Sequence, residues 1–219
     1  TPQSRGMLIM LFLPYILMIT AFMGGMHLAI DTTAGEKERH SLEPLLINPV
    51  PRWQIMMGKL LATAIFGMAS LVLTLIAFRI TLPYLPLAAL GVDLGLGAVA
   101  MVGILLVVAP IALMAAALLT VLATYAKSFR EAQSYMGLVI LIPMVPTLMF
   151  MSDPVKPEAS MMPIPLFSQN LLIGELVRGE AVPVQWLLYS AAGTLIFAFA
   201  LMAFAATLFN RPRVMFSDS

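Results

Sequence analysis

The sequence contains no cysteine and only two histidines among its 219 residues. Without cysteine, the chain has no disulfide, no thiolate metal site and no cysteine nucleophile. The two histidines, His27 and His40, are too few for a membrane metalloprotease site built on paired histidines, and neither an HExxH nor a GxSxG motif is present. We therefore expect no metal site and no catalytic role in this chain.

Charge is also scarce, since 11% of the residues are charged, 61% are hydrophobic and the mean hydropathy is +0.97. A soluble domain usually has about a quarter of its residues charged. The formal net charge is +1 and no basic stripe is present, which argues against nucleic acid as a partner. The 18 methionines are scattered through apolar runs, as expected for gap-filling side chains. The composition predicts an integral protein of the lipid bilayer.

Long apolar runs recur along the chain, and a helix needs about 20 residues to cross a bilayer. They predict an all-α, polytopic membrane helical bundle that forms a single transmembrane domain over residues 1–219. The five expected spans are residues 7–30, 60–82, 98–125, 135–151 and 185–209. Proline removes an internal hydrogen bond, so Pro110 is expected to bend the third span, and Pro143 and Pro146 make the fourth the least regular.

The longest polar interruption, residues 31–59, predicts a helical elbow at the membrane surface. Thr33 and Glu36 have the spacing of a capping box, which predicts a helix that begins near Ala34. A short apolar face follows, formed by Leu42, Leu45 and Leu46. Such an elbow offers a soluble partner a rigid surface to push on.

The distribution of lysine and arginine predicts the orientation, because these residues favour cytoplasmic loops. Eight lie on the side of the elbow, the turn at 127–130 and the C-terminal tail, whereas four lie on the other side. The elbow and the C-terminus are therefore expected in the cytoplasm. A short interfacial or re-entrant helix is expected over residues 167–179 on the outer side. The chain begins outside without methionine, so we expect a preceding segment.

The elbow carries a recognisable motif. Ala34 to Leu46 reads AGEKERHSLEPLL, and Pro49-Val50 and Gly58-Lys59 follow. This pattern resembles the permease subunit of type-2 ABC exporters, although His40 stands where a glycine is common.

Two further motifs resemble the sodium-extrusion (NatB-like) branch of that family. They are SFREAQSY at 128–135, and IPLFSQN at 164–170 followed by Gly179-Glu180. The likeness covers nearly the whole chain. Family members have six spans with a large outer domain between the first two, so the chain resembles the part from the second span onward.

This resemblance implies a permease subunit of an ATP-driven exporter in a bacterial plasma or inner membrane. Such a permease pairs with a second copy or a homologous permease, has no nucleotide site of its own, and relies on a cytoplasmic ATPase subunit that binds ATP and Mg. The suggested substrate is sodium. The implied ATPase-coupling residues are Glu36, Lys37, Glu38, Arg39, Ser41, Leu42, Glu43, Leu45 and Leu46. A second, smaller cytoplasmic contact is implied at Lys127, Phe129, Arg130 and Glu131.

Several polar residues have two interpretations. His27 and Asp31 share one helical face, and they either line the inner mouth of a pathway, or Asp31 caps the next helix while His27 lies among headgroups. Gln169 and Asn170 either shape an exit gate or cap the outer helix. Thr63, Ser70 and Thr74 on the second span either provide a polar lining or form contacts between helices.

Two other functions remain as alternatives to the exporter. One is a secondary transporter or channel in which His27 and Asp31 couple transport to a cation. The other is a structural membrane scaffold with spans and no path. Vanadate-sensitive transport indicates the exporter, uncoupler-sensitive transport indicates the secondary transporter, and a scaffold shows neither.

Overall fold

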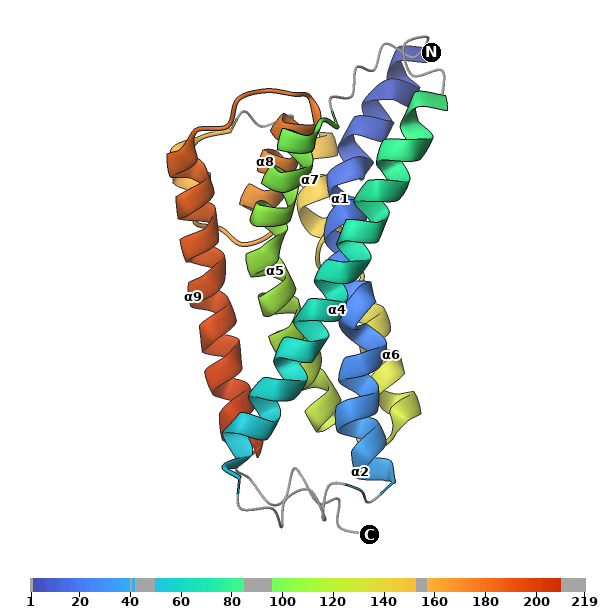
Figure 1. Cartoon of the computed structure of the whole chain (residues 1–219), viewed down its shortest axis with the longest axis vertical. Coiled ribbons are helices and arrows are strands. Elements are labelled where there is room, and N and C mark those ends of the chain that lie inside the picture. Colours follow the sequence, from blue (N-terminus) through green and yellow to red (C-terminus); the bar gives the residue numbers. More distant parts are fainter. Residues whose placement is uncertain (1, 40, 42–49, 85–95, 153–156, 210–219) are drawn as a thin grey trace.

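The structure, a computed structural model, describes residues 2–39, 41, 50–84, 96–152 and 157–209. Every regular element in these ranges is helical, which confirms the all-α prediction (Figure 1). The longer helices are α1 (Pro2–Ile30), α4 (Arg52–Thr81), α5 (Ala98–Tyr125) and α9 (Val184–Phe209). The shorter helices are α2 (Glu36–Glu38), α6 (Phe129–Val139), α7 (Met144–Ser152) and α8 (Phe167–Val177). A π-helical turn occupies Asp31–Gly35, and 3-10 turns occupy Leu82–Tyr84 and Ala159–Met161.

Within the described ranges, five helical segments are long and apolar enough to cross a membrane. The helix predicted at 98–125 coincides with α5, and Pro110 lies inside it without ending it. By contrast, α4 begins at Arg52, well before the predicted residue 60. Hydropathy marks only the part of a helix that lies in hydrocarbon, so it missed the polar first turns of α4.

The fourth segment is interrupted, as its prolines predict. α6 ends at Val139 and α7 begins at Met144, and Pro143 lies between them. The backbone bonds across the interruption join residues three apart, from Leu141 N to Leu138 O and from Met144 N to Leu141 O, each 3.1 Å. Proline lacks the N–H that a continuous helix needs, so the chain makes short turns here instead.

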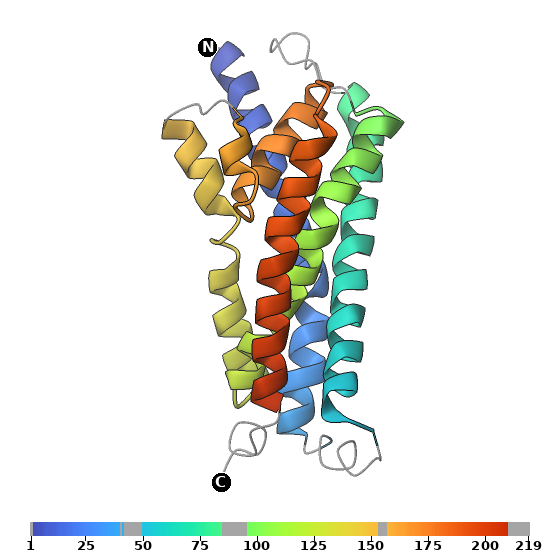
Figure 2. The ribbon, with the colours of Figure 1, turned by 90° about the vertical axis from the view of Figure 1, so that its left-hand side faces the viewer.

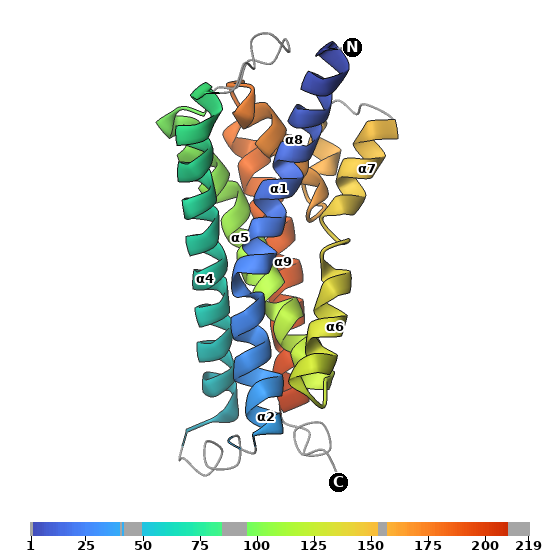
Figure 3. The ribbon, with the colours of Figure 1, turned by 90° about the vertical axis from the view of Figure 1, so that its right-hand side faces the viewer.

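α5 lies in the middle of the bundle, and α1 and α4 cross closely beside it (Figures 1 and 3). Glycines allow this crossing. A Cβ atom at Gly67 would lie 2.4 Å from the carbonyl oxygen of Ala21, and one at Gly25 would lie 2.5 Å from that of Thr63. Small residues let two helix backbones approach closely in a membrane, so these positions set the α1–α4 spacing.

The two ends of the bundle carry different elements (Figures 2 and 3). One end, called here the α2 end, holds α2, the first turns of α4 and α6, and the last turns of α5 and α9. The opposite end, called the α8 end, holds α7, α8 and the first turns of α1. The described parts of the predicted elbow thus share one end with the 127–130 turn, and the helix predicted at 167–179 lies at the other.

Candidate coupling site

The helix that begins as α1 continues through the π turn into α2. Gly35 has helical angles (φ −66°, ψ −40°), and no side chain caps α2. The predicted capping box of Thr33 and Glu36 is therefore wrong. An N-cap has non-helical backbone and precedes unpaired N–H groups. Here Thr33 lies inside the helical run, and Glu36 binds a neighbouring helix instead.

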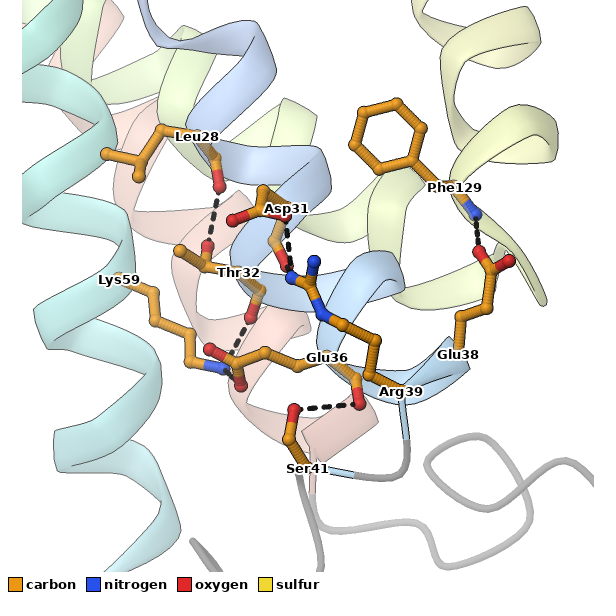
Figure 4. Close-up of polar contacts among 9 residues, drawn as sticks. All are labelled: Leu28, Asp31, Thr32, Glu36, Glu38, Arg39, Ser41, Lys59 and Phe129. Atoms are coloured by element: carbon orange, nitrogen blue, oxygen red, sulfur yellow. Dashed lines mark hydrogen bonds and ion pairs between the residues drawn. The ribbon is translucent and has the colours of Figure 1, made fainter.

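Glu36 connects this helix to α4. Lys59 on α4 donates to Glu36 Oε2 and to the carbonyl oxygen of Thr32, each at 2.5 Å (Figure 4). Only 10% of the Lys59 side chain and 24% of the Glu36 side chain are exposed. A salt bridge that is partly shielded from water is screened less by salt than an exposed one. The pair therefore fixes the start of α4 to the π turn.

Lys37 connects the same helix to α5. Its side chain is buried, and its Nζ donates to the carbonyl oxygens of Thr124 at 2.7 Å and Ala126 at 3.1 Å. The last carbonyls of a helix have no partner within the helix, and a cation is favourable there. Lys37 thus caps the C-terminus of α5.

Glu38 connects it to α6. Glu38 Oε2 accepts a hydrogen bond from the backbone N–H of Phe129 at 2.7 Å (Figure 4). A second N–H in the first turn of α6, that of Glu131, donates to the hydroxyl of Ser128 at 3.2 Å. The carboxylate of Glu131 accepts from the N–H of Lys127 at 2.7 Å. The N-terminus of α6 is therefore capped from within and from α2.

The second predicted contact divides into exposed and packed residues. Lys127 and Arg130 are exposed at the α2 end, whereas Phe129 is half-buried and packs against the core. Glu131 is half-buried and also accepts a hydrogen bond from the hydroxyl of Tyr135. Of these four residues, only Lys127 and Arg130 are exposed.

Arg39 binds back to its own helix. Its Nη2 lies 2.6 Å from Asp31 Oδ1, and both side chains are more than half exposed, so the pair contributes about 0–1 kcal/mol. Asp31 does not cap a helix, because Ile30 before it is helical and the chain continues as a π turn, so the capping role given to Asp31 is wrong. His27 lies exposed one turn earlier.

The rest of the elbow lies mostly outside the described residues. This holds for Leu42, Glu43, Leu45 and Leu46. Ser41 is described and exposed, and its hydroxyl donates to the carbonyl oxygen of Glu36 at 3.2 Å.

Four consecutive charged side chains, Glu36 to Arg39, thus bind four different elements: α4, α5, α6 and the π turn. We call these residues the charge hub. Successive residues on a helix are about 100° apart, so neighbouring side chains diverge. The sequence interpretation treated them as rim charges for a partner and missed Lys59, Thr124 and Ala126 as their partners. Alternating charges on consecutive helical residues were the available signal, because one flat interface cannot contact all of them.

Within the π turn, Thr33 is 2% exposed and has an unpaired hydroxyl. Among the buried side-chain oxygen and nitrogen atoms of the described residues, Thr33 Oγ1 is the one that has no hydrogen-bond partner. An unsatisfied buried hydroxyl costs about 1–3 kcal/mol. The neighbour of Thr33 in the same turn, Thr32, donates to the carbonyl four residues earlier at 2.7 Å. Five threonines in α-helices make the same bond at 2.7–2.9 Å, namely Thr20, Thr63, Thr74, Thr120 and Thr124.

The α8 end has a neutral polar cluster. Gln169 Oε1 accepts from the N–H of Leu166, which caps α8, and its Nε2 donates to the Thr194 hydroxyl on α9. Asn170 Nδ2 donates to the Thr147 hydroxyl on α7 at 2.8 Å. We call the buried set the α8 network, and it consists of Thr147, Ser168, Gln169, Asn170, Ser190 and Thr194. The capping interpretation thus holds for Gln169, whereas Asn170 joins two helices.

Two polar residues of α4, Thr63 and Ser70, lie against glycines of α1. Thr63 and Thr74 donate within α4, and Ser70 lies against Gly24 at the crossing, where a Cβ on that glycine would lie 2.3 Å from Ser70 Oγ. These contacts favour the interhelical interpretation. No three His, Asp or Glu side chains cluster as metal ligands in the described ranges.

A small acidic pair lies at the end of α8, with Glu175 in its last turn and Glu180 just after it. Arg178 binds Glu175 at 2.5 Å and Glu180 at 3.5 Å. Burial raises the pKa of Glu175, and a hydrogen bond with Glu180 raises that pKa further. The same hydrogen bond lowers the pKa of Glu180.

Comparison with known proteins agrees with the permease motifs. Residues 2–209 match the family described as ABC-2 family transporter protein. The ABC transporter permease protein NatB of Bacillus subtilis (strain 168) is 32% identical over 211 residues, which cover 94% of this chain and 54% of that protein. The chain thus spans about half the length of this relative. No solved structure matches the chain significantly.

Proposed function

The chain belongs to the ABC-2 family of transporter permeases, and we propose that it serves an ATP-driven exporter whose ATPase is a separate subunit. In this proposal the ATPase binds ATP and Mg, and the permease works beside a second copy or a homologous permease in a bacterial cell membrane. The α2 end and the C-terminus face the cytoplasm, where the ATPase docks. The permease contributes no nucleotide chemistry and converts the movement of its partner into movement of its spans.

The observation that carries the proposal is the charge hub. Glu36 binds the second turn of α4, Lys37 binds the end of α5 and Glu38 binds the start of α6, so a displacement of α2 acts on the three helices together. These contacts lie at or near one end of each helix. A push at this point tilts the helices without first disrupting their apolar packing.

The partner surface follows from what the hub leaves exposed. The side chains of the hub mostly bind within the chain, so we propose that the ATPase contacts the leucines of the elbow, Leu42, Leu45 and Leu46. Exposed Ser41, Lys127 and Arg130 lie at the same end and supply the polar rim. A hydrophobic centre with a polar rim is the usual anatomy of a protein interface.

Two substitutions separate docking from coupling. Leu45→Asp should abolish co-purification of the ATPase, because a charge replaces an interface anchor. Lys37→Met should leave co-purification intact and reduce ATP-dependent transport at least about tenfold, because α5 is released from α2. Arg52→Met is the matched control, since it removes a half-buried cation at the same end that makes no described bond. Unchanged binding by Leu45→Asp would refute the docking surface.

The energy source distinguishes this function from its alternatives. Transport by the reconstituted permease and ATPase should stop with vanadate and persist with an uncoupler. The reverse pattern would indicate a secondary transporter, and the absence of transport in both conditions would indicate a scaffold.

The pathway is proposed to lie between two permease copies. His27 and Asp31 are exposed on the single chain near the α2 end, which suits residues that face a shared path. Gln169 and Asn170 are buried, so in this proposal they position the outer gate from behind. His27→Ala and Asp31→Asn should lower efflux without lowering ATPase binding. Normal efflux by both variants would remove them from the path.

Sodium is the proposed substrate. The test is ATP-dependent movement of radioactive sodium in proteoliposomes that contain both subunits. Potassium and a lipophilic cation serve as competing substrates, and preference for either would reassign the substrate.

A further inference from the structure

The π turn Asp31–Gly35 combines two features that are unfavourable on their own. A π-helix is rare and occurs mostly as single turns within α-helices, frequently at functional sites. The turn also leaves the buried Thr33 hydroxyl without a partner. Neighbouring Thr32, which precedes it by one residue, donates to Leu28 O at 2.7 Å.

Both features would be relieved if the turn became α-helical. An α-helix presents the carbonyl of residue i−4 to a threonine hydroxyl, which for Thr33 is that of Ala29. This bond is made by five threonines in the regular α-helices of the described ranges, Thr20, Thr63, Thr74, Thr120 and Thr124, so it forms readily here. Local energetics therefore favour the α form of the turn.

The charge hub opposes that conversion. Replacing a π turn by an α turn shifts the following residues by one helical position, which is a rotation of about 100° and a rise of about 1.5 Å relative to α1. Such a shift would separate Glu36 from Lys59, Lys37 from the end of α5, and Glu38 from Phe129. A strained backbone conformation persists only where surrounding contacts hold it, and these contacts do so.

We propose that the Asp31–Gly35 turn is a one-residue register switch at the end of α1. The π register is held by the charge hub, and the α register is adopted when the hub contacts are released. Whatever displaces α2 then rotates it by a discrete step, because the two hydrogen-bond registers have no stable form between them. The switch requires neither nucleotide nor substrate, so its test is independent of the proposed function.

Spin labels can measure the register directly, because the 219-residue chain has no cysteine and introduced ones are its only labelling sites. One label is placed at Ser41→Cys, just after α2, and the other at Gln133→Cys, an exposed position on α6. The chain in lipid nanodiscs should show one main distance, with the second population below about 10%. Lys37→Met should make the second distance the major one.

A deletion distinguishes a change of register from simple fraying. A π turn contains one residue more than the α turn that spans the same length of helix. Deleting Thr33 should therefore give a regular α turn while α1 before it and the charge hub after it keep their contacts. Lys37→Met combined with this deletion should therefore return to the single original distance. Removing Thr20 is the matched control, because that residue lies in regular α-helix and its loss should misplace every contact on one side.

Three results would overturn the proposal. They are an unchanged distance in Lys37→Met, a second distance that persists when Thr33 is also deleted, and a Thr33 deletion that unfolds as readily as the Thr20 deletion. If Lys37→Met does not fold, the pair Glu36→Gln and Glu38→Gln releases α4 and α6 instead and must give the same second distance.

Discussion

The polar clusters at the two ends of the bundle are built from different chemistry. The charge hub uses charged side chains that bind backbone groups at helix ends and oppositely charged side chains, and it adjoins a turn with an unpaired hydroxyl. The α8 network uses amides and hydroxyls that are buried and bonded to one another. Charged groups at the end of a bundle can exchange a protein partner for water. Buried neutral groups cannot, because opening the network leaves donors unpaired in a medium of low dielectric.

This difference assigns separate mechanical roles to the two ends. At the α8 end, α7 and α8 are also joined by the rings of Phe150 and Phe167, whose centroids are 4.6 Å apart in an edge-on arrangement. Contacts of this kind hold α7, α8 and α9 together as one body. At the α2 end, contacts that can be exchanged allow movement.

Gln169→Leu should cause the largest loss of stability, about 3 kcal/mol, because it leaves the N–H of Leu166 and the Thr194 hydroxyl without their partner. This corresponds to a fall in melting temperature of roughly 6–12 °C by thermal unfolding in detergent. Gln133→Leu is the control, since Gln133 is exposed on α6. Equal effects of the two substitutions would contradict the structural role of the α8 network.

Lys37→Met should destabilise the protein less, by about 2 kcal/mol, although it removes two hydrogen bonds to the end of α5. The loss is smaller because the π turn can relax and give Thr33 a partner. This loss of stability is measured by thermal unfolding, with Arg52→Met as the control variant. A loss larger than that of Gln169→Leu would show that the hub, and not the α8 network, is the stability centre.

Glu36 and Lys59 should show a coupling energy of about 1 kcal/mol in a double-mutant cycle with Glu36→Gln and Lys59→Met. The coupling should shrink as sodium chloride rises from about 0.1 M to about 1 M, because salt screens charges. The matching cycle with Asn170→Leu and Thr147→Val should not depend on salt. Equal salt dependence in the two cycles would mean that the clusters do not differ in kind.

The acidic pair at the end of α8 should give the smallest effect, a change in melting temperature of about 2 °C or less. The raised pKa of Glu175 contributes stability below its unfolded pKa, and this is lost as pH rises through the folded value. The advantage of the parent over Glu175→Gln should therefore decline as pH rises above about 4. Glu180→Gln should show the opposite trend, because the pKa of Glu180 is lowered. Parallel trends would contradict the assignment.

The sequence predicts the apolar elements well and the charged end poorly. α5 is apolar throughout, so hydropathy places both of its ends correctly. The elbow contains Thr33 and Glu36 at capping-box spacing, and that local pattern points to a new helix. The bundle overrides it, because Glu36 gains a stronger partner in Lys59 and the helix gains α5 and α6 at its end. Such partners lie 23 to 91 residues away in the chain, beyond the reach of local pattern.

At the α8 end, sequence reasoning found Gln169 and Asn170 but not their partners. Polar residues next to an apolar helix start are visible in any sequence, and capping was one expected role. Thr147 and Thr194 sit singly in apolar segments, where threonine is common and carries no signal of its own. Their role depends on how α7 and α9 pack on α8, which only the tertiary structure supplies.

The glycine contacts between α1 and α4 have a mechanical consequence. With Gly25 and Gly67 each pressed against the opposite backbone, the two helices have little room to slide or bend independently. The two helices should move as one rigid unit, with the Asp31–Gly35 turn at the α2 end of that unit and the α8 end of the bundle at its other end. A small swing at the α2 end then becomes a comparable swing some 40 Å away, the length of a helix of about 28 residues.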